Sequence, residues 1–189
     1  MQRYTRQQII LHWLSLILIA VTYAVIELKG YIPKSNPWHN DFKLIHFNTG
    51  VLVFIVMAIR IYLYNKHELP KITPVPPKWQ KVLSSVMHKI LYVCFFLLPV
   101  LGVVGMVIGG KQWDFLGIHI SALSNPNKPL YSDIKAVHEY IANVGYFLIG
   151  IHALAAIYHH HIVKDDTLKR MVQLTISALL NIVGKADIR

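Results

Sequence analysis

The last apolar stretch of the chain carries polar side chains at a helical repeat. His138, Gly145, His152 and His159 follow one another at intervals of seven residues. Seven residues turn an α-helix by about 700°, so neighbouring positions in this series lie within about 20° of one face. Titratable side chains inside a membrane span are costly and functional by default, and imidazole is the commonest metal ligand. The stripe therefore predicts a metal or redox site.

The spacing of the stripe suits two haem irons, one toward each membrane face. His138 and His152 are about 21 Å apart along a helix axis. Gly145, halfway between them, lets a bulky group approach the backbone. The chain has one cysteine, Cys94, and therefore no Cys-x-x-Cys-His attachment motif. We expect non-covalent haems of the b type.

A six-coordinate haem iron needs a second imidazole at the same depth in the membrane. His46 lies five residues inside Asp41, and His138 lies five residues inside Asp133. Both positions are close to the same end of their spans. The sequence therefore predicts that His46 and His138 share one iron near that face.

The second iron is predicted near the opposite face, where His12 lies six residues inside Arg6. Depth alone leaves its partner open between His159, which is closer to that boundary, and His152. Another interpretation is a haem-free protein whose histidines only bond neighbouring helices. A metal-ion transporter is a further alternative, which the scarcity of acidic residues within the spans disfavours.

The elements that must position these side chains are membrane helices. The chain is 54% hydrophobic and 15% charged, well below the charged fraction of about 25% in soluble domains. A span needs about 20 apolar residues, and open strands would leave backbone groups unpaired in lipid. We predict an all-α, integral membrane four-helix bundle. Its expected spans are 7–26, 44–64, 82–110 and 134–163.

Basic residues cluster between the apolar stretches. A net charge of +10 would suggest nucleic acid in a soluble protein, but this clustering is typical of membrane-flanking charge, so no nucleic-acid partner is expected. Lys and Arg are more numerous around the N-terminus, the 60–81 loop and the C-terminal tail, which predicts that both termini are cytoplasmic. Residues 1–171 would form the bundle domain. The tail, 172–189, would include part of an interfacial helix.

Short motifs in a specific order resemble the prokaryotic cytochrome b561 family over about residues 3 to 171. The last helix carries the most specific part of the resemblance. The matching residues are Tyr4-Thr5-Arg6, Gln8, His12-Trp13, Ile45-His46, Gly50, Arg60, Pro99-Val100-Leu101-Gly102, His138-Glu139, Asn143, Gly145-Tyr146, Gly150, His152, His159-His160, Lys164-Asp165, Thr167-Leu168 and Arg170-Met171.

The resemblance implies two haem b groups with bis-histidine ligation, and it resolves the open pairing. The implied pairs are His12 with His152 and His46 with His138. Arg60, at the inner end of the second span, would pair with the anionic haem propionates, although positive-inside placement explains it equally well. Gly145 would lie beside the cofactors.

The resemblance also implies electron exchange with ubiquinone in the bacterial inner membrane. Some family members oxidise superoxide, so we predict an oxidoreductase between superoxide, or another small donor, and ubiquinone. His88, His159 and Arg6 are candidate quinone-site residues, and His88 is equally explained as a hydrogen-bonded interface residue. The alternative is an electron-conduit cytochrome b subunit of a larger dehydrogenase. Short loops offer little docking surface, so no obligate protein partner is expected.

The paired histidines predict the cofactor content of the purified protein. We expect two non-covalent b haems per chain, because four intramembrane imidazoles match at two depths. A pyridine haemochrome assay on detergent-purified protein measures this number. One haem per chain, or none, would contradict the prediction.

Overall fold

Four long helices make up most of the computed structural model, which describes residues 4–67 and 70–172. They are α1 (Arg6–Gly30), α2 (Trp38–Lys66), α3 (Lys78–Ile108) and α4 (Lys128–Tyr158), and α4 continues into a π-helical turn, η1 (His159–Val163). Each is long and apolar enough to cross a membrane, which confirms the predicted all-α four-helix membrane fold. Most of the predicted tail helix lies outside the described residues.

Polar side chains cap the starts of α1 and α4, whereas α2 and α3 begin directly after Pro37 and Pro77. Thr5 and Gln8 form a capping box: the Gln8 backbone N–H donates to Thr5 Oγ1 at 3.3 Å, and the Thr5 N–H donates to Gln8 Oε1 at 2.9 Å. At α4, the Asn127 side chain accepts from the backbone N–H of Leu130 at 3.0 Å. Lys164, in the left-handed region with φ 59°, ends η1.

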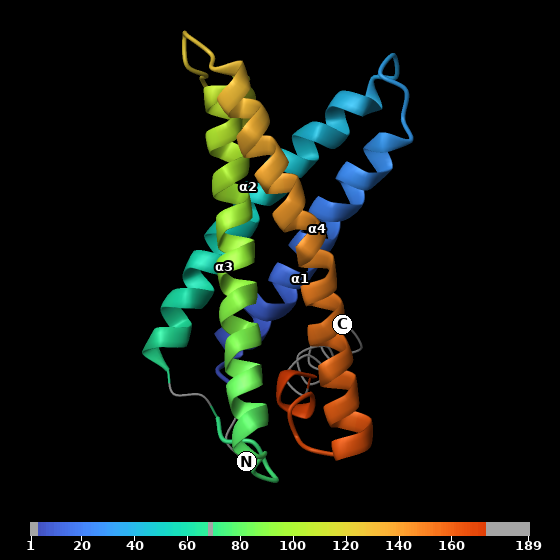
Figure 1. The fold of residues 1–189 in the computed structure, drawn as a ribbon, viewed down its shortest axis with the longest axis vertical. Helices are drawn as coiled ribbons and strands as arrows, with labels where there is room; N and C mark the ends of the chain where they lie inside the picture. Colours follow the sequence, from blue (N-terminus) through green and yellow to red (C-terminus); the bar gives the residue numbers. More distant parts are fainter. Residues whose placement is uncertain (1–3, 68–69, 173–189) are drawn as a thin grey trace, which may run out of the picture.

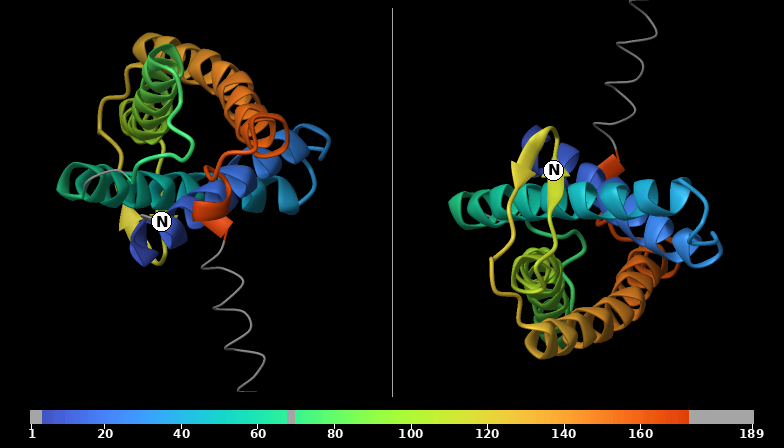
Figure 2. Two further views of the ribbon diagram at one scale, coloured as in Figure 1. Left: turned by 90° about the horizontal axis from the view of Figure 1, so that it is seen from below. Right: turned by 90° about the horizontal axis from the view of Figure 1, so that it is seen from above.

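The bundle consists of two helical hairpins that cross each other (Figure 1). α1 and α2 form one hairpin, and α3 and α4 form the other. The start of α1 and the end of α4 lie at the same end of the bundle, which we call the N-terminal end, and both hairpin connections lie at the opposite end, the hairpin end (Figure 1). Views along the bundle show α4 starting beside α3 and diverging from it (Figure 2).

The connection between α3 and α4 contains a small β-hairpin that the sequence did not predict. Strands β1 (Trp113–Phe115) and β2 (Ile118–Ile120) pair antiparallel. Leu116 and Gly117 form the turn with positive φ angles of 48° and 88°, as a two-residue hairpin turn requires. The Asn48 side chain in α2 holds this hairpin, accepting from Leu116 N–H at 3.1 Å and donating to the Asp114 carbonyl at 3.2 Å.

The centre of the bundle is apolar and closely packed. Thr22 of α1 and Thr49 of α2 share a hydrogen bond of 2.8 Å between their hydroxyl groups. The buried cluster lies between α1, α2 and α3 and consists of Ile19, Val53, Met57, Cys94, Phe95 and Leu98. Tyr23 crosses from α1 to α4, where its hydroxyl donates to the Ala142 carbonyl at 2.8 Å.

Gly145 provides the space that Tyr23 occupies, which generates a testable prediction. A Cβ at Gly145 would overlap the Tyr23 hydroxyl and lie 3.5 Å from the Phe95 ring and 3.7 Å from Cys94 Sγ. Gly145→Ala should therefore destabilise the fold by about 1–3 kcal/mol through overpacking. Gly150→Ala is the matched control in the same helix, because nothing lies within 4 Å of a Cβ there.

Thermal unfolding in detergent compares the two variants. The loss in melting temperature caused by Gly145→Ala should be smaller in a Tyr23→Phe protein, because that protein lacks the overlapping hydroxyl. Equal melting temperatures for the Gly145→Ala and Gly150→Ala proteins would show that the crossing of Tyr23 in front of Gly145 is not a tight contact.

Candidate functional site

His46 of α2 and His138 of α4 face each other toward the hairpin end of the bundle. Their ring centroids are 6.3 Å apart, with an interplanar angle of 72°. His46 Nδ1 lies 2.9 Å from the Thr22 carbonyl. Because a carbonyl only accepts, this Nδ1 carries the proton, and Nε2 keeps its lone pair free for a metal. His138 Nδ1 is buried, near the Leu98 carbonyl but without a well-formed hydrogen bond.

His12 of α1 and His152 of α4 form a similar pair toward the N-terminal end. Their ring centroids are 6.4 Å apart, with an interplanar angle of 62°. The predicted alternative partner, His159, lies on η1 and makes its closest polar contact elsewhere. The crossing of the hairpins tilts α4 relative to α1 (Figure 1), so the structure brings His152 rather than His159 to His12.

Both separations suit a single metal ion between two imidazoles. A metal–nitrogen bond of about 2.0 Å, added to about 1.1 Å from nitrogen to ring centre on each side, separates two ring centroids by about 6.2 Å. The observed values of 6.3 and 6.4 Å match this separation. The donor sets of His46 with His138 and of His12 with His152 thus fit the bis-histidine ligation of a haem iron.

The helices that carry these pairs are not packed closely against each other. Among the described residues, extended backbone packing joins α1 to α2, α2 to α3, and α3 to α4. The pairs instead span α1 to α4 and α2 to α4, where side chains bridge wider separations. Directly packed helices lie about 8–10 Å apart, which leaves no room for a planar cofactor. The bundle therefore widens at the interfaces that the histidines span.

Arg60 of α2 lies beside the pair formed by His12 and His152, where the sequence predicted a partner for propionates. Its Nη1 donates to Ser15 Oγ at 2.5 Å, its Nη2 lies 3.2 Å from His12 Nδ1, and its guanidinium lies 5.3 Å from the Tyr92 ring centroid. Arginine only donates, so His12 Nδ1 accepts here. Metal binding at His12 Nε2 would protonate Nδ1, and Arg60 would then turn to another acceptor such as a carboxylate.

His88 of α3 lies beside the pair formed by His12 and His152. Its ring centroid lies 5.4 Å from that of His152, which is too short for a metal ion between the two rings. A third imidazole, which the predicted ligand scheme left unassigned, therefore lies beside this pair. Arg6 is the first residue of α1 and is exposed, so it stands apart from this cluster.

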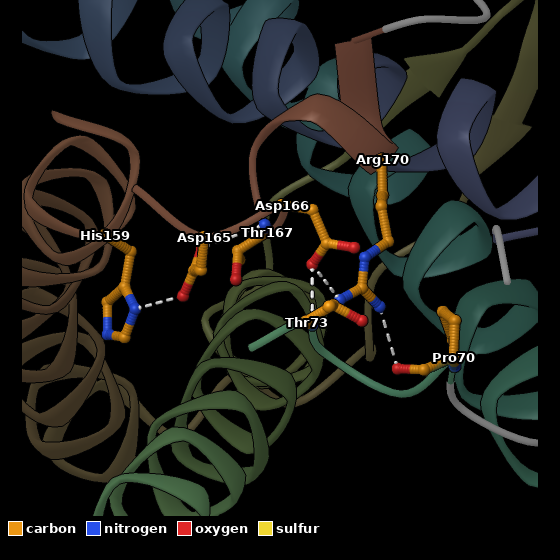
Figure 3. A network of polar contacts seen from close by, with 7 residues as sticks. All are labelled: Pro70, Thr73, His159, Asp165, Asp166, Thr167 and Arg170. Atoms are coloured by element: carbon orange, nitrogen blue, oxygen red, sulfur yellow. Dashed lines mark hydrogen bonds and ion pairs between the residues drawn. The ribbon is translucent and has the colours of Figure 1, made fainter. Parts of the chain in front are cut away.

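His159 belongs to a polar network that closes the N-terminal end (Figure 3). Its Nδ1 donates to Asp165 Oδ2 at 2.6 Å, and Asp165 is 2% exposed. Arg170, also 2% exposed, pairs with Asp166 and donates to the Pro70 carbonyl at 2.9 Å. This network, which we call the terminal clamp, fixes the segment after α4 to the loop between α2 and α3.

The carboxylates of the terminal clamp are held in their charged form. Burial opposes ionisation of Asp165, but hydrogen bonds from Thr167 and His159 outweigh it and lower its pKa. Burial likewise opposes ionisation of Asp166, but the hydrogen bonds from Arg170 and the Thr73 backbone, together with the charge of Arg170, outweigh it and lower that pKa. Because both folded pKa values are depressed, their stabilising contribution is present above the unfolded pKa and is lost as the pH falls through the folded value.

One cavity lies beside a histidine pair, and another lies beside Arg60. One of about 40 Å³ lies beside His46 and His138 and is otherwise lined by Phe47, Gly50, Val51, Pro99, Gly102, Val103, Met106 and Trp113. The other, of about 50 Å³, lies beside Arg60 and is lined by Tyr4, Gln8, Leu63, Tyr64, Tyr92 and Met171. A Cβ at Gly50 would meet nothing within 4 Å, so Gly50, rather than Gly145, leaves open space beside a histidine pair. A cofactor contact at Gly145 stays a prediction.

A four-helix membrane bundle with facing imidazoles at two interfaces has the layout of a membrane cytochrome b. The family model for prokaryotic cytochrome b561 matches residues 3–173. The chain therefore belongs to the prokaryotic cytochrome b561 family, whose members are haem-binding electron-transport proteins of membranes.

Two curated relatives agree with this assignment. The chain is 43% identical to cytochrome b561 homolog 1 of Escherichia coli K12 over 91% of this chain and 98% of that protein. It is 37% identical to the probable superoxide oxidase CybB of Yersinia pestis over 90% of this chain and 96% of that protein.

Alanine variants of the two histidine pairs should lose different haems. His46→Ala or His138→Ala should remove the haem toward the hairpin end, and His12→Ala or His152→Ala the one toward the N-terminal end, because each iron loses an axial ligand. His159→Ala is the matched control, since that imidazole contacts Asp165 instead. Haem content and low-temperature difference spectra of each variant provide the measurement. Loss of a haem from His159→Ala with retention in His152→Ala would contradict the pairing.

Proposed function

We propose that this chain is a superoxide:ubiquinone oxidoreductase that holds two b haems, one between His46 and His138 and one between His12 and His152. The observation that carries the proposal is the presence of two imidazole pairs at metal-binding separation, toward opposite ends of a membrane bundle. The donor is proposed from the likeness to a relative named probable superoxide oxidase. When bound, each haem supplies a one-electron iron couple.

The proposed reaction transfers two electrons from superoxide to one quinone. Two superoxide anions each release one electron and leave as O₂, and one quinone takes up two electrons and two protons to form quinol. The small anion is proposed to deliver its electron to the pair toward the hairpin end, His46 and His138, which leaves the pair at the other end of the bundle to the quinone. The residues of this chain orient the ligands: the Thr22 carbonyl fixes the His46 tautomer.

The quinone is proposed to bind at the N-terminal end, beside His12 and His152. Quinone is apolar and enters from lipid, so its ring oxygens need donors placed near the membrane boundary. His88 lies against His152, and His159 holds its Nδ1 proton toward Asp165. His88 would donate a hydrogen bond to a quinone oxygen. His159, whose Nδ1–H is engaged by Asp165, would donate from Nε2 in its cationic form and so pass on a proton from the aqueous side. Arg6, exposed at the start of α1 and outside this cluster, would add positive charge at the aqueous boundary of the same end.

Stopped-flow absorbance after a pulse of superoxide tests the proposal. Wild-type haem should become reduced rapidly and then reoxidise when ubiquinone is present. His88→Ala and His159→Ala should be reduced at the wild-type rate but reoxidise more slowly, by about tenfold or more, because each lacks a donor to the quinone oxygens. His161→Ala, an exposed residue of the same turn as His159, serves as the control.

The outcomes separate the parts of the proposal. A wild-type haem that superoxide does not reduce would remove superoxide as the donor. Normal reoxidation in both histidine variants would remove the quinone site at the N-terminal end. Tight copurification with a dehydrogenase subunit, together with no turnover by the isolated chain, would instead identify an electron-conduit subunit.

A further inference from the structure

Trp113 is a buried hydrogen-bond donor beside the pair formed by His46 and His138. It is the first residue of β1 and is 7% exposed. Its ring lies 6.3 Å from that of Phe47, between centroids, and it lines the same cavity as the two imidazoles. Its Nε1–H is buried and has no hydrogen-bond partner within residues 4–67 and 70–172. An indole nitrogen only donates, and a buried donor without an acceptor is costly, so an acceptor is expected at this position.

The position of Trp113 is fixed from α2, the helix that also carries His46. Asn48, two residues after His46, bonds the backbone of Asp114 and of Leu116 on both sides of the hairpin turn. The β-hairpin is thus attached to α2, and its tryptophan is buried against the cavity beside the two imidazoles. A loop residue that served only to cover the end of the bundle would not need this attachment.

The other residues of the cavity identify the kind of acceptor. Among the described lining residues, only the two imidazoles and Trp113 carry a side-chain N–H, and the rest are aliphatic, aromatic, methionine or glycine. His46 Nδ1 already donates to Thr22. His138 Nδ1 lies near the Leu98 carbonyl, which leaves the indole N–H of Trp113 as the donor of this cavity with no acceptor nearby among the described residues. A haem held by His46 and His138 would bring two carboxylates to this site.

We propose that the indole N–H of Trp113 donates a hydrogen bond to a propionate of the haem between His46 and His138. This inference rests on the proposed ligation of that haem. A donor on the propionate partly neutralises a negative charge near the iron. It therefore stabilises the reduced form relative to the oxidised form, so Trp113 holds the midpoint potential of this haem above the value it would otherwise have.

Trp113→Phe tests this assignment, because it removes the N–H and keeps a ring against Phe47. Redox titration should show two haems still bound, with the reduction equilibrium of one of them shifted toward the oxidised form by a factor of about three to ten. The other haem should be unchanged. Trp38→Phe is the matched control, since Trp38 is an exposed tryptophan at the start of α2 on the same end of the bundle.

Trp113→Gln separates the donor from the ring, because it keeps an N–H and loses the aromatic contact. The proposal predicts that Trp113→Gln keeps the haem content, or the midpoint potential of this haem, closer to the wild-type value than Trp113→Phe does. Unchanged potential and retention in Trp113→Phe would overturn it, and so would a Trp113→Gln protein that is more impaired than Trp113→Phe. A His46→Ala protein that keeps every haem would instead refute the proposed ligation, independently of Trp113.

Discussion

An imidazole that is to bind a metal inside a bilayer must be held at its other nitrogen, because a ring that is free to rotate or change tautomer presents the wrong atom. His46 shows how this chain meets that constraint, with Nδ1 bonded to the Thr22 carbonyl across the α1–α2 interface. The carbonyl comes from a helix that Thr22 and Thr49 fasten to α2. The orientation of one ligand thus depends on the packing of a whole helical hairpin, and a loosened hairpin would lose the site before it lost the fold.

The same constraint explains why the bundle is not uniformly packed. α2 and α3 share an apolar core that includes Val53, Phe95 and Leu98, whereas α4 approaches α1 and α2 through bridging side chains. Tyr23 fills the middle of this wider interface and leaves the two imidazole pairs on either side of it. A tight contact at Gly145 therefore lies between the two imidazole pairs along α4.

The sequence predicted the spans well, because long uncharged stretches have one structural solution in lipid. It predicted the histidine pairs less completely. Counting residues from the ends of each span assumes that the helices are parallel. Because α4 crosses α1 at an angle, the count could not decide whether His152 or His159 is the partner of His12. The contact of His88 with His152 joins helices that no local pattern relates. Trp113 was missed because a leucine at positive φ, Leu116, gives no recognisable turn signal for the hairpin that positions it.

The placement of α4 has a consequence for how the protein is made. Both imidazole pairs take one member from α4, and α4 is the last of the four helices to leave the ribosome. Neither site exists while α1, α2 and α3 are already in the membrane, so the growing chain cannot capture a cofactor early at either one. Both sites become complete together, when the final span inserts and the terminal clamp closes behind it. Assembly of this protein therefore has a built-in order, in which membrane insertion precedes cofactor loading and an unfinished chain remains unable to exchange electrons.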